Sequence, residues 1–125
     1  NLENYFIIHN YLNNSEVAQL YKNSYCILIP TIVGTYTFPH IEAFFFKKII
    51  FGNNKNLDQD FKDKIINLDL NDHSDLYKKY SKIDLNENFA KNMIERNRKF
   101  YDDNFKEEKI LNIYKDLISN YINEN

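Results

Sequence analysis

The sequence predicts an α/β fold in which an open, mostly parallel sheet carries helices on both faces. Two observations predict it. Short apolar runs alternate with segments of helical periodicity along the 125 residues. The central runs YCILI and IIF are also apolar at successive positions, which is typical of strands buried between helices. Sheets of this kind bind ligands beyond the carboxyl ends of their strands, so the loops at those ends are the first place to seek a site.

The first predicted strand runs from about Tyr5 to His9, because NYFIIHNYL is aromatic and β-branched and ends in the turn-forming residues NNS. A helix follows in SEVAQLYKNS, with Ser15 or Asn14 as its cap. Its apolar face consists of Val17, Leu20 and Tyr21. The next strand is Tyr25–Ile29, a continuous apolar run that Pro30 bounds.

The loop PTIVGTYTF then leads into a helix that Pro39 opens, since proline is favoured at the first helical position. KKIIF, ending at Gly52, is the next strand, and KIINLDL forms another short strand after the polar stretch GNNKNLDQDFKD. NDHSDLYKKYSKI predicts a helix capped by Asn71 or Asp72. Two amphipathic helices, NENFAKNMIERNRKFYDD and FKEEKILNIYKDLISNYI, complete the chain. The apolar stripe of the last helix consists of Ile110, Leu111, Tyr114, Leu117, Ile118 and Tyr121.

Composition limits the function classes. With 43% hydrophobic and 27% charged residues, and no linker or repeat, residues 1–125 are expected to form a single unit or a piece of one. A formal net charge of -2 and a pI near 5.9 argue against a nucleic-acid partner. The single cysteine, Cys26, cannot form an internal disulfide, and no apolar run reaches the roughly 20 residues of a membrane span. We therefore expect a cytoplasmic protein.

The candidate site is the loop from Pro30 to Phe38, at the carboxyl end of the strand Tyr25–Ile29. The helix N-terminus that follows it exposes unpaired N–H groups and a partial positive charge, which suit a phosphate or diphosphate. Hydroxyl groups of Thr35, Tyr36 and Thr37 lie just before the helix. Glu42 follows in the helix, and its carboxylate is suited to accept hydrogen bonds from paired sugar hydroxyls. The same carboxylate could instead complement the helix dipole, and spacing alone leaves both interpretations open.

Other residues near this helix have simpler interpretations. The run Phe44–Phe46 is expected to pack in the core, and Lys47 and Lys48 are expected to form a solvated helix end rather than an anion clamp. His9, His40 and His73 lack metal-ligand spacing, so no metal site is expected. His40 could contact a phosphate, but a partly exposed histidine at a helix start is the simpler interpretation.

Residues 25–51 resemble the donor-site segment of the retaining GT-B glycosyltransferases of family 4, the "glycosyl transferases group 1" type. The family pattern is an apolar strand, P-S-x-x-E-G-F-G-x-P-x-x-E-A, a helix, G-x-P and a second strand. This chain reads P-T-I-V-G-T-Y-T-F-P-H-I-E-A from Pro30 to Ala43. The resemblance extends to FIIHNYLNNSEVAQLYKNS before this motif and to YDDNFKEEKILNIYKDLI after it, so it covers nearly the whole chain.

The resemblance implies that residues 1–125 are part of a Rossmann-like C-terminal, donor-binding domain that ends in two helices. The full protein would transfer a sugar with retention from a nucleotide-diphosphate sugar to a glycan or lipid-linked acceptor, without metal or cofactor. Such proteins act in polysaccharide biosynthesis, and peripheral contact with the inner face of the membrane stays open. The acceptor-binding N-terminal domain would precede Asn1, and the last helix would pack onto it.

The same resemblance assigns the site residues, with Glu42 as the ligand of the nucleotide ribose and no catalytic residue identified. The nucleotide-sugar-binding set is Gly34, Thr35, Tyr36, Thr37, Phe38, Pro39, His40 and Glu42.

This chain departs from the family pattern at five positions. The first glutamate of the motif falls on Gly34, its two loop glycines on Thr35 and Thr37, the helix-end glycine on Lys47 and the following proline on Ile49. Non-glycine residues in the loop restrict how closely the backbone approaches a phosphate. Two alternatives therefore stay open: a glycosyltransferase-like domain that binds a nucleotide sugar or a partner protein without catalysis, and a non-enzymatic flavodoxin-like α/β module.

Overall fold

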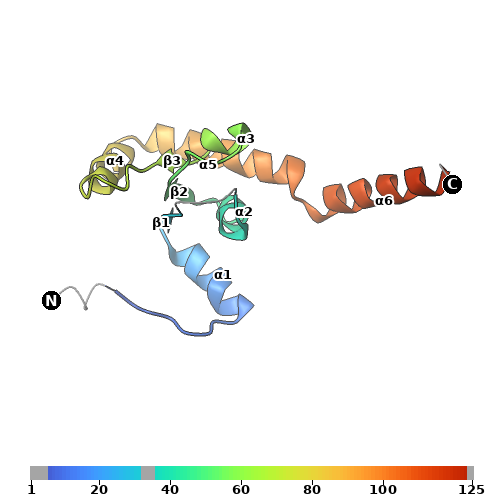
Figure 1. Ribbon diagram of the computed structural model, residues 1–125. Helices are drawn as coiled ribbons and strands as arrows, with labels where there is room; N and C mark the ends of the chain where they lie inside the picture. Colours follow the sequence, from blue (N-terminus) through green and yellow to red (C-terminus); the bar gives the residue numbers. More distant parts are fainter. Residues whose placement is uncertain (1–5, 32–35, 124–125) are drawn as a thin grey trace.

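The computed structural model describes residues 6–31 and 36–123, and side chains as far as residue 119. Within these residues, strands β1 (Cys26–Ile29), β2 (Ile49–Gly52) and β3 (Ile66–Asn67) form a parallel sheet in the order β1-β2-β3 (Figure 1). The prediction of an α/β fold with a parallel sheet is confirmed for this part of the chain.

The strand register sorts the apolar side chains onto two faces. Cys26 lies opposite Ile49, and Ile27 lies opposite Ile50. Because successive side chains of a strand point to opposite faces, Ile27 and Ile50 belong to one hydrophobic cluster and Cys26 and Ile49 to another. The sheet therefore has a core on each side.

Helices α1 (Asn14–Asn23), α2 (Phe38–Phe45) and α3 (Gln59–Lys62) supply the first core. Its most buried members are Ala43 and Phe44 of α2 and Ile50 of β2, each 0% exposed. The aromatic residues Phe100, Tyr101 and Phe105 at the end of α5 (Glu87–Asn104) and just beyond it pack against the same cluster. The Phe44–Phe46 run is thus largely core, as predicted, although Phe45 is 43% exposed.

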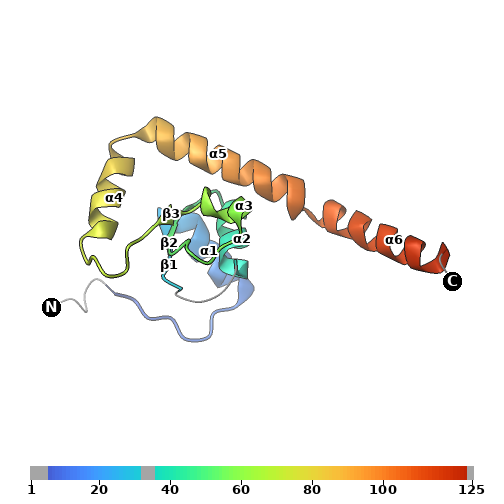
Figure 2. The same ribbon diagram turned by 45° about the horizontal axis from the view of Figure 1, so that its top comes forward.

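Helix α4 (Asp75–Asp84) and the N-terminal half of α5 cover the opposite face, where Ile83 and Met93 pack on Ile49 and Phe51. Figure 1 and Figure 2 both show α2 and α4 on opposite sides of the strands. The half-buried thiol of Cys26 lies on this second face, and burial raises its pKa. Helices therefore cover both faces of the sheet.

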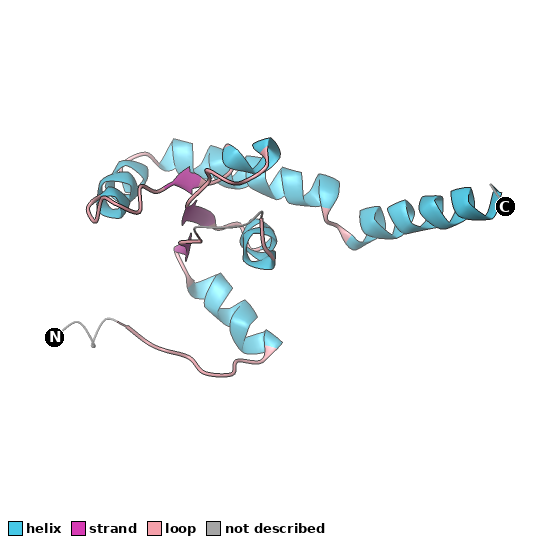
Figure 3. Cartoon of the chain, in the orientation of Figure 1, coloured by secondary structure: helices cyan, strands magenta, loops and turns pink. Residues whose placement is uncertain are grey.

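Helix α6 (Glu107–Asn123) extends away from the rest of the structure (Figure 3). As far as Ile118, the residues of its predicted apolar stripe are exposed, from 39% at Ile110 to 60% at Tyr114. None of the described helices is long and apolar enough to cross a membrane.

The predicted strand from Tyr5 to His9 is wrong for its described part. Phe6, Ile7 and Ile8 have no regular structure and are 70%, 82% and 85% exposed. A strand is stable only where its backbone groups pair with a neighbour, and among the described residues β1 pairs only with β2. Periodicity and composition detect the apolar segment, but they do not show whether a neighbouring strand is present for it to pair with.

Three predictions of helix ends and short elements need correction. Asn13, rather than Asn14 or Ser15, caps α1: its Oδ1 accepts from the amides of Ser15 and Glu16, and Glu16 accepts from the Asn13 amide at 2.8 Å. Helix α4 begins at Asp75 with Ser74 as its cap, because Asp72 instead closes a turn by accepting from Ser74. The polar stretch after β2 contains α3, and β3 is shorter than KIINLDL.

The turn between α2 and β2 ends the helix by a Schellman motif. The amide of Lys48 donates to the Ala43 carbonyl at 2.8 Å, and the amide of Lys47 donates to the Phe44 carbonyl at 3.2 Å. Lys47 takes the left-handed conformation that this motif requires, with a φ of 57°. Glycine adopts that conformation without steric cost, whereas a lysine pays for its Cβ.

Replacing this lysine should stabilise the protein. Lys47→Gly is expected to raise the free energy of unfolding by about 0.5–1 kcal/mol, because relief of the left-handed strain exceeds the extra entropy of glycine in the unfolded chain. Chemical denaturation measures the change. Lys47→Ala is the matched control, since it removes the charge and keeps the Cβ. An equal gain in both variants would assign the effect to the lost charge instead.

Candidate functional site

The predicted site lies where the chain leaves β1 and enters α2. Gly34 and Thr35 fall outside the described residues. Tyr36 is fixed before the helix by an aromatic cluster: its ring stacks on Phe61 with centroids 4.2 Å apart and meets the edge of Phe105 at 6.2 Å. Because Phe61 belongs to the buried core, this stack ties the end of the loop to the body of the fold.

His40 organises the start of α2. Its Nδ1 accepts from the Thr37 amide at 3.1 Å, and the Thr37 hydroxyl lies 3.0 Å from the same nitrogen. The side chain is only 1% exposed, so the interpretation of a partly exposed histidine is wrong. Burial lowers the pKa of His40, and the neutral ring with Nδ1 as acceptor is the form that caps the helix.

These contacts use most of the amide donors of the first turn. Thr37 donates to His40, the His40 amide donates to the Thr37 carbonyl at 3.0 Å, and Pro39 has no N–H. Phe38 is the first residue of α2, so its amide has no acceptor within the helix. The N-terminus of α2 therefore presents fewer free donors to an anion than an uncapped helix would.

A hollow of about 470 Å³ opens beside this helix start. Its lining consists of Tyr36, Thr37, Phe38, Ile41 and Asp58. Phe38, at the first helical position, is 81% exposed. The structure therefore brings the predicted residues Tyr36, Thr37 and Phe38 together. Ile41 and Asp58 join them, and no sequence motif distinguished those two.

Glu42 is the fifth residue of α2. It lies on a different side of the helix from Ile41, which lines the hollow. Its Oε2 accepts from the Tyr21 hydroxyl of α1 at 2.9 Å. The helix dipole acts mainly within the first turn, so this position does not favour the dipole interpretation. The next residue, Ala43, is 0% exposed against the sheet, which explains why a small side chain follows the glutamate.

Lys48 has a structural contact instead of a solvated one. Its Nζ donates to the carbonyl of Lys22 at 2.9 Å and to that of Ser24 at 2.7 Å, at the C-terminus of α1. A cation there stabilises the helix end. The prediction of a solvated lysine is wrong for Lys48, while Lys47 is exposed as predicted.

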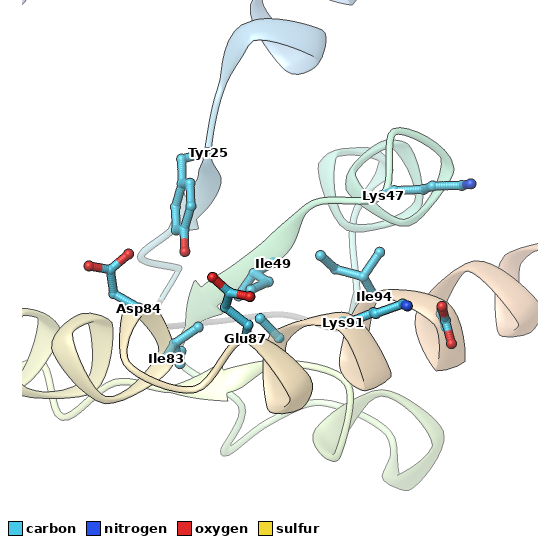
Figure 4. Close-up of a pocket in the computed structure, with 10 residues that line it drawn as sticks. Tyr25, Lys47, Ile49, Ile83, Asp84, Glu87, Lys91 and Ile94 are labelled. Atoms are coloured by element: carbon cyan, nitrogen blue, oxygen red, sulfur yellow. The ribbon is translucent and has the colours of Figure 1, made fainter.

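A second cavity, of about 520 Å³, lies at the opposite side of the sheet, beside the amino ends of strands β1 and β2 (Figure 4). Ile49, Ile83 and Ile94 form its apolar floor. Charged side chains ring it: Lys47, Asp84, Glu87, Lys91 and Glu95. Partial burial and the negative charge of Asp84 raise the pKa of Tyr25, which overhangs the cavity. None of the predicted site residues that the structure describes lines this cavity.

No group of three His, Cys, Asp or Glu side chains with metal-binding geometry occurs among residues 6–31 and 36–123. No protein-family model matches the chain, and no curated protein or solved structure matches it significantly. The assignment of a function consequently depends on the motif and on the geometry around α2.

The buried histidine should make stability depend on pH in a defined window. Above pH 6.5 the ring is neutral in both states. As the pH falls below 6.5, the unfolded chain binds a proton that the folded state resists, so the free energy of unfolding falls by up to about 1.4 kcal/mol per pH unit. The loss continues until the pH reaches the lowered pKa of the folded state.

Denaturant titrations between pH 7.5 and 5.5 measure this effect. His40→Gln is the matched variant, because glutamine can still accept from the Thr37 amide but does not titrate. We expect the variant to lose most of the acid-induced decline. The same pH slope in both proteins would show that other groups cause it.

Proposed function

We propose that the chain is part of the nucleotide-sugar-binding domain of a GT-B glycosyltransferase. In the full protein, a sugar would pass from a nucleotide-diphosphate donor to a glycan or lipid-linked acceptor with retention of configuration. The hollow at the start of α2 would receive the sugar and the adjoining diphosphate of the donor, and Glu42 would accept hydrogen bonds from the ribose. Electrostatic stabilisation of the leaving diphosphate by the helix N-terminus would be the chain's contribution to transfer.

The observation that carries the proposal is the placement of the P-x-x-E-A segment. Pro39 is in the first turn of a helix that begins beyond the carboxyl end of a parallel strand, Ala43 is buried on the sheet and Glu42 is exposed. Open α/β sheets bind their ligands beyond the carboxyl ends of the strands, which is where this helix begins. The positions of Pro39, Glu42 and Ala43 are therefore compatible with the proposed donor site.

The turn after α2 supports the alignment on which the proposal depends. The family's helix-end glycine corresponds to Lys47, and Lys47 has a positive φ in this structure. A position that needs the left-handed conformation is where glycine is expected. The local backbone therefore agrees with the resemblance even where the residue does not.

A second candidate, a related domain that binds a nucleotide sugar without transferring it, is favoured by the same site. Thr37 and His40 bind each other, and Asp58 places a carboxylate beside the hollow. Both features weaken phosphate binding relative to a glycine-rich loop. Tight donor binding with no transfer by the full-length protein would identify this candidate.

The proposal is tested by calorimetric titration of the full-length protein with UDP-, GDP- and ADP-sugars. We expect one donor to bind, and Glu42→Ala to weaken that binding about tenfold or more, since a carboxylate that accepts two hydroxyl hydrogen bonds contributes roughly 1.5–3 kcal/mol. Glu95→Ala is the matched control, because it removes an exposed carboxylate from the middle of α5.

Two results would contradict the proposal. Absence of binding by every donor would exclude a nucleotide-sugar site. Equal affinity of wild type and Glu42→Ala would exclude Glu42 as a ribose ligand. Transfer assays with the donor that binds then separate the enzyme from the binding-only domain.

A further inference from the structure

The contact between Tyr21 and Glu42 joins two helices at the proposed site. The Tyr21 hydroxyl of α1 donates to Glu42 Oε2 of α2 at 2.9 Å. Tyr21 is only 9% exposed, and its ring stacks on Phe46 with centroids 5.2 Å apart and planes 10° apart. The phenol is therefore held from the core side, while the carboxylate that it binds is exposed.

We propose that Tyr21 is a positioning residue that orients the Glu42 carboxylate toward the ribose hydroxyls of a nucleoside diphosphate. This inference rests on the proposed function, because it assigns a second residue to the same site. Tyr21 itself does not contact the ligand. It acts by holding one carboxylate oxygen and leaving the other to accept.

The geometry supplies the reason that a tyrosine suits this role. A glutamate has several rotatable bonds, and an exposed one samples many rotamers unless a partner holds it. Within residues 6–31 and 36–123, Tyr21 is the hydrogen-bond partner that the structure gives to the Glu42 carboxylate. Because the phenol ring is fixed by its stack, the oxygen that it binds is fixed as well, and a ligand then meets a carboxylate already in place.

The protonation state of the Tyr21 hydroxyl agrees with its role as the hydrogen-bond donor to Glu42. Burial and the hydrogen bond to the Glu42 carboxylate raise the pKa of Tyr21 well above its ordinary value. The hydroxyl therefore keeps its proton at neutral pH and can act only as the donor to Oε2. A charged acceptor also makes this a stronger bond than one between neutral groups.

The helices explain why these two residues meet. Val17 packs against the core cluster that contains Tyr21, and the Lys48 ammonium group binds the carbonyls at the end of α1, so this helix is tied to the turn that follows α2. Tyr21 thereby lies against α2 at the level of Glu42. From the sequence, Tyr21 belongs to an apolar face, and nothing in its spacing shows where its hydroxyl points.

The test compares Tyr21→Phe with wild type in the full-length protein. UDP, GDP and ADP are titrated by calorimetry, and the nucleotide that binds is compared with its 2′,3′-dideoxy counterpart. We expect Tyr21→Phe to weaken the ribonucleotide roughly 3- to 10-fold, which is the range for one lost hydrogen bond. The dideoxy nucleotide, which lacks the hydroxyls that Glu42 would bind, should have the same affinity for both proteins.

Two further variants complete the comparison. Tyr77→Phe removes an exposed hydroxyl from α4 and should change neither affinity. In a Glu42→Ala background, Tyr21→Phe should have no additional effect, because a positioning residue has nothing left to hold. Equal weakening of the ribonucleotide and the dideoxy nucleotide would overturn the proposal, since it would show a structural role for Tyr21.

A separate measurement tests the contact without any nucleotide. The ¹³Cζ resonance of Tyr21 is followed against pH in wild type and in Glu42→Gln. Loss of the negative charge should lower the pKa of Tyr21 toward its ordinary value of 10.0. An unchanged pKa would show that the contact is absent in solution and would overturn the role of Tyr21 alone. A shifted pKa together with no binding of UDP, GDP or ADP would instead overturn the proposed function and, with it, the positioning role.

Discussion

The burial of strand β2 on both faces is the constraint on which the rest of the structure depends. All four residues, Ile49–Gly52, are buried. Such a strand needs a hydrogen-bonded neighbour on each edge and an apolar cover on each face. Strands β1 and β3 supply the neighbours, α1, α2 and α3 supply one cover, and α4 supplies the other, with α5 contributing to both. The backbone of β1 lies so close to Gly52 that a Cβ there would be 2.7 Å from the Ile29 carbonyl oxygen.

The position of the candidate site follows from this burial rather than from the loop that carries the motif. Ala43 and Phe44 press α2 onto the sheet, and the Schellman turn at Lys47 leads almost directly into β2. With its C-terminus tied to the amino end of β2, an eight-residue helix begins near the carboxyl end of β1. The aromatic stack of Tyr36 on Phe61 then holds the entering chain against the same core.

Short sequence patterns predicted the strands and the helix start that depend on neighbouring residues. The apolar runs predicted β1 and β2, Pro39 predicted the start of α2 to within one residue, and the Phe44 side chain was expected in the core. Two of the predictions that failed depend on partners distant in sequence. Phe6–His9 lacks a strand to pair with among the described residues, and Lys48 binds carbonyls at the end of α1. His40 differs, because its contact is local: the amide of Thr37, three residues earlier, donates to the His40 Nδ1. The Lys48 contact has no signature in composition or spacing.

The hydrogen bonds within the site limit which groups of a ligand it can bind. A glycine-rich loop binds phosphate through many free amides, whereas here Thr37 and His40 satisfy each other and Pro39 has none to offer. The hollow instead presents aromatic and aliphatic walls, a threonine hydroxyl and the Asp58 carboxylate, with the Tyr21–Glu42 pair farther along α2. Groups of that kind suit neutral hydroxyls and apolar rings better than they suit phosphate charge. Recognition of a nucleotide sugar by this chain would therefore depend more on the ribose and the sugar than on the diphosphate, and a cation for the phosphates would have to come from a residue outside this set.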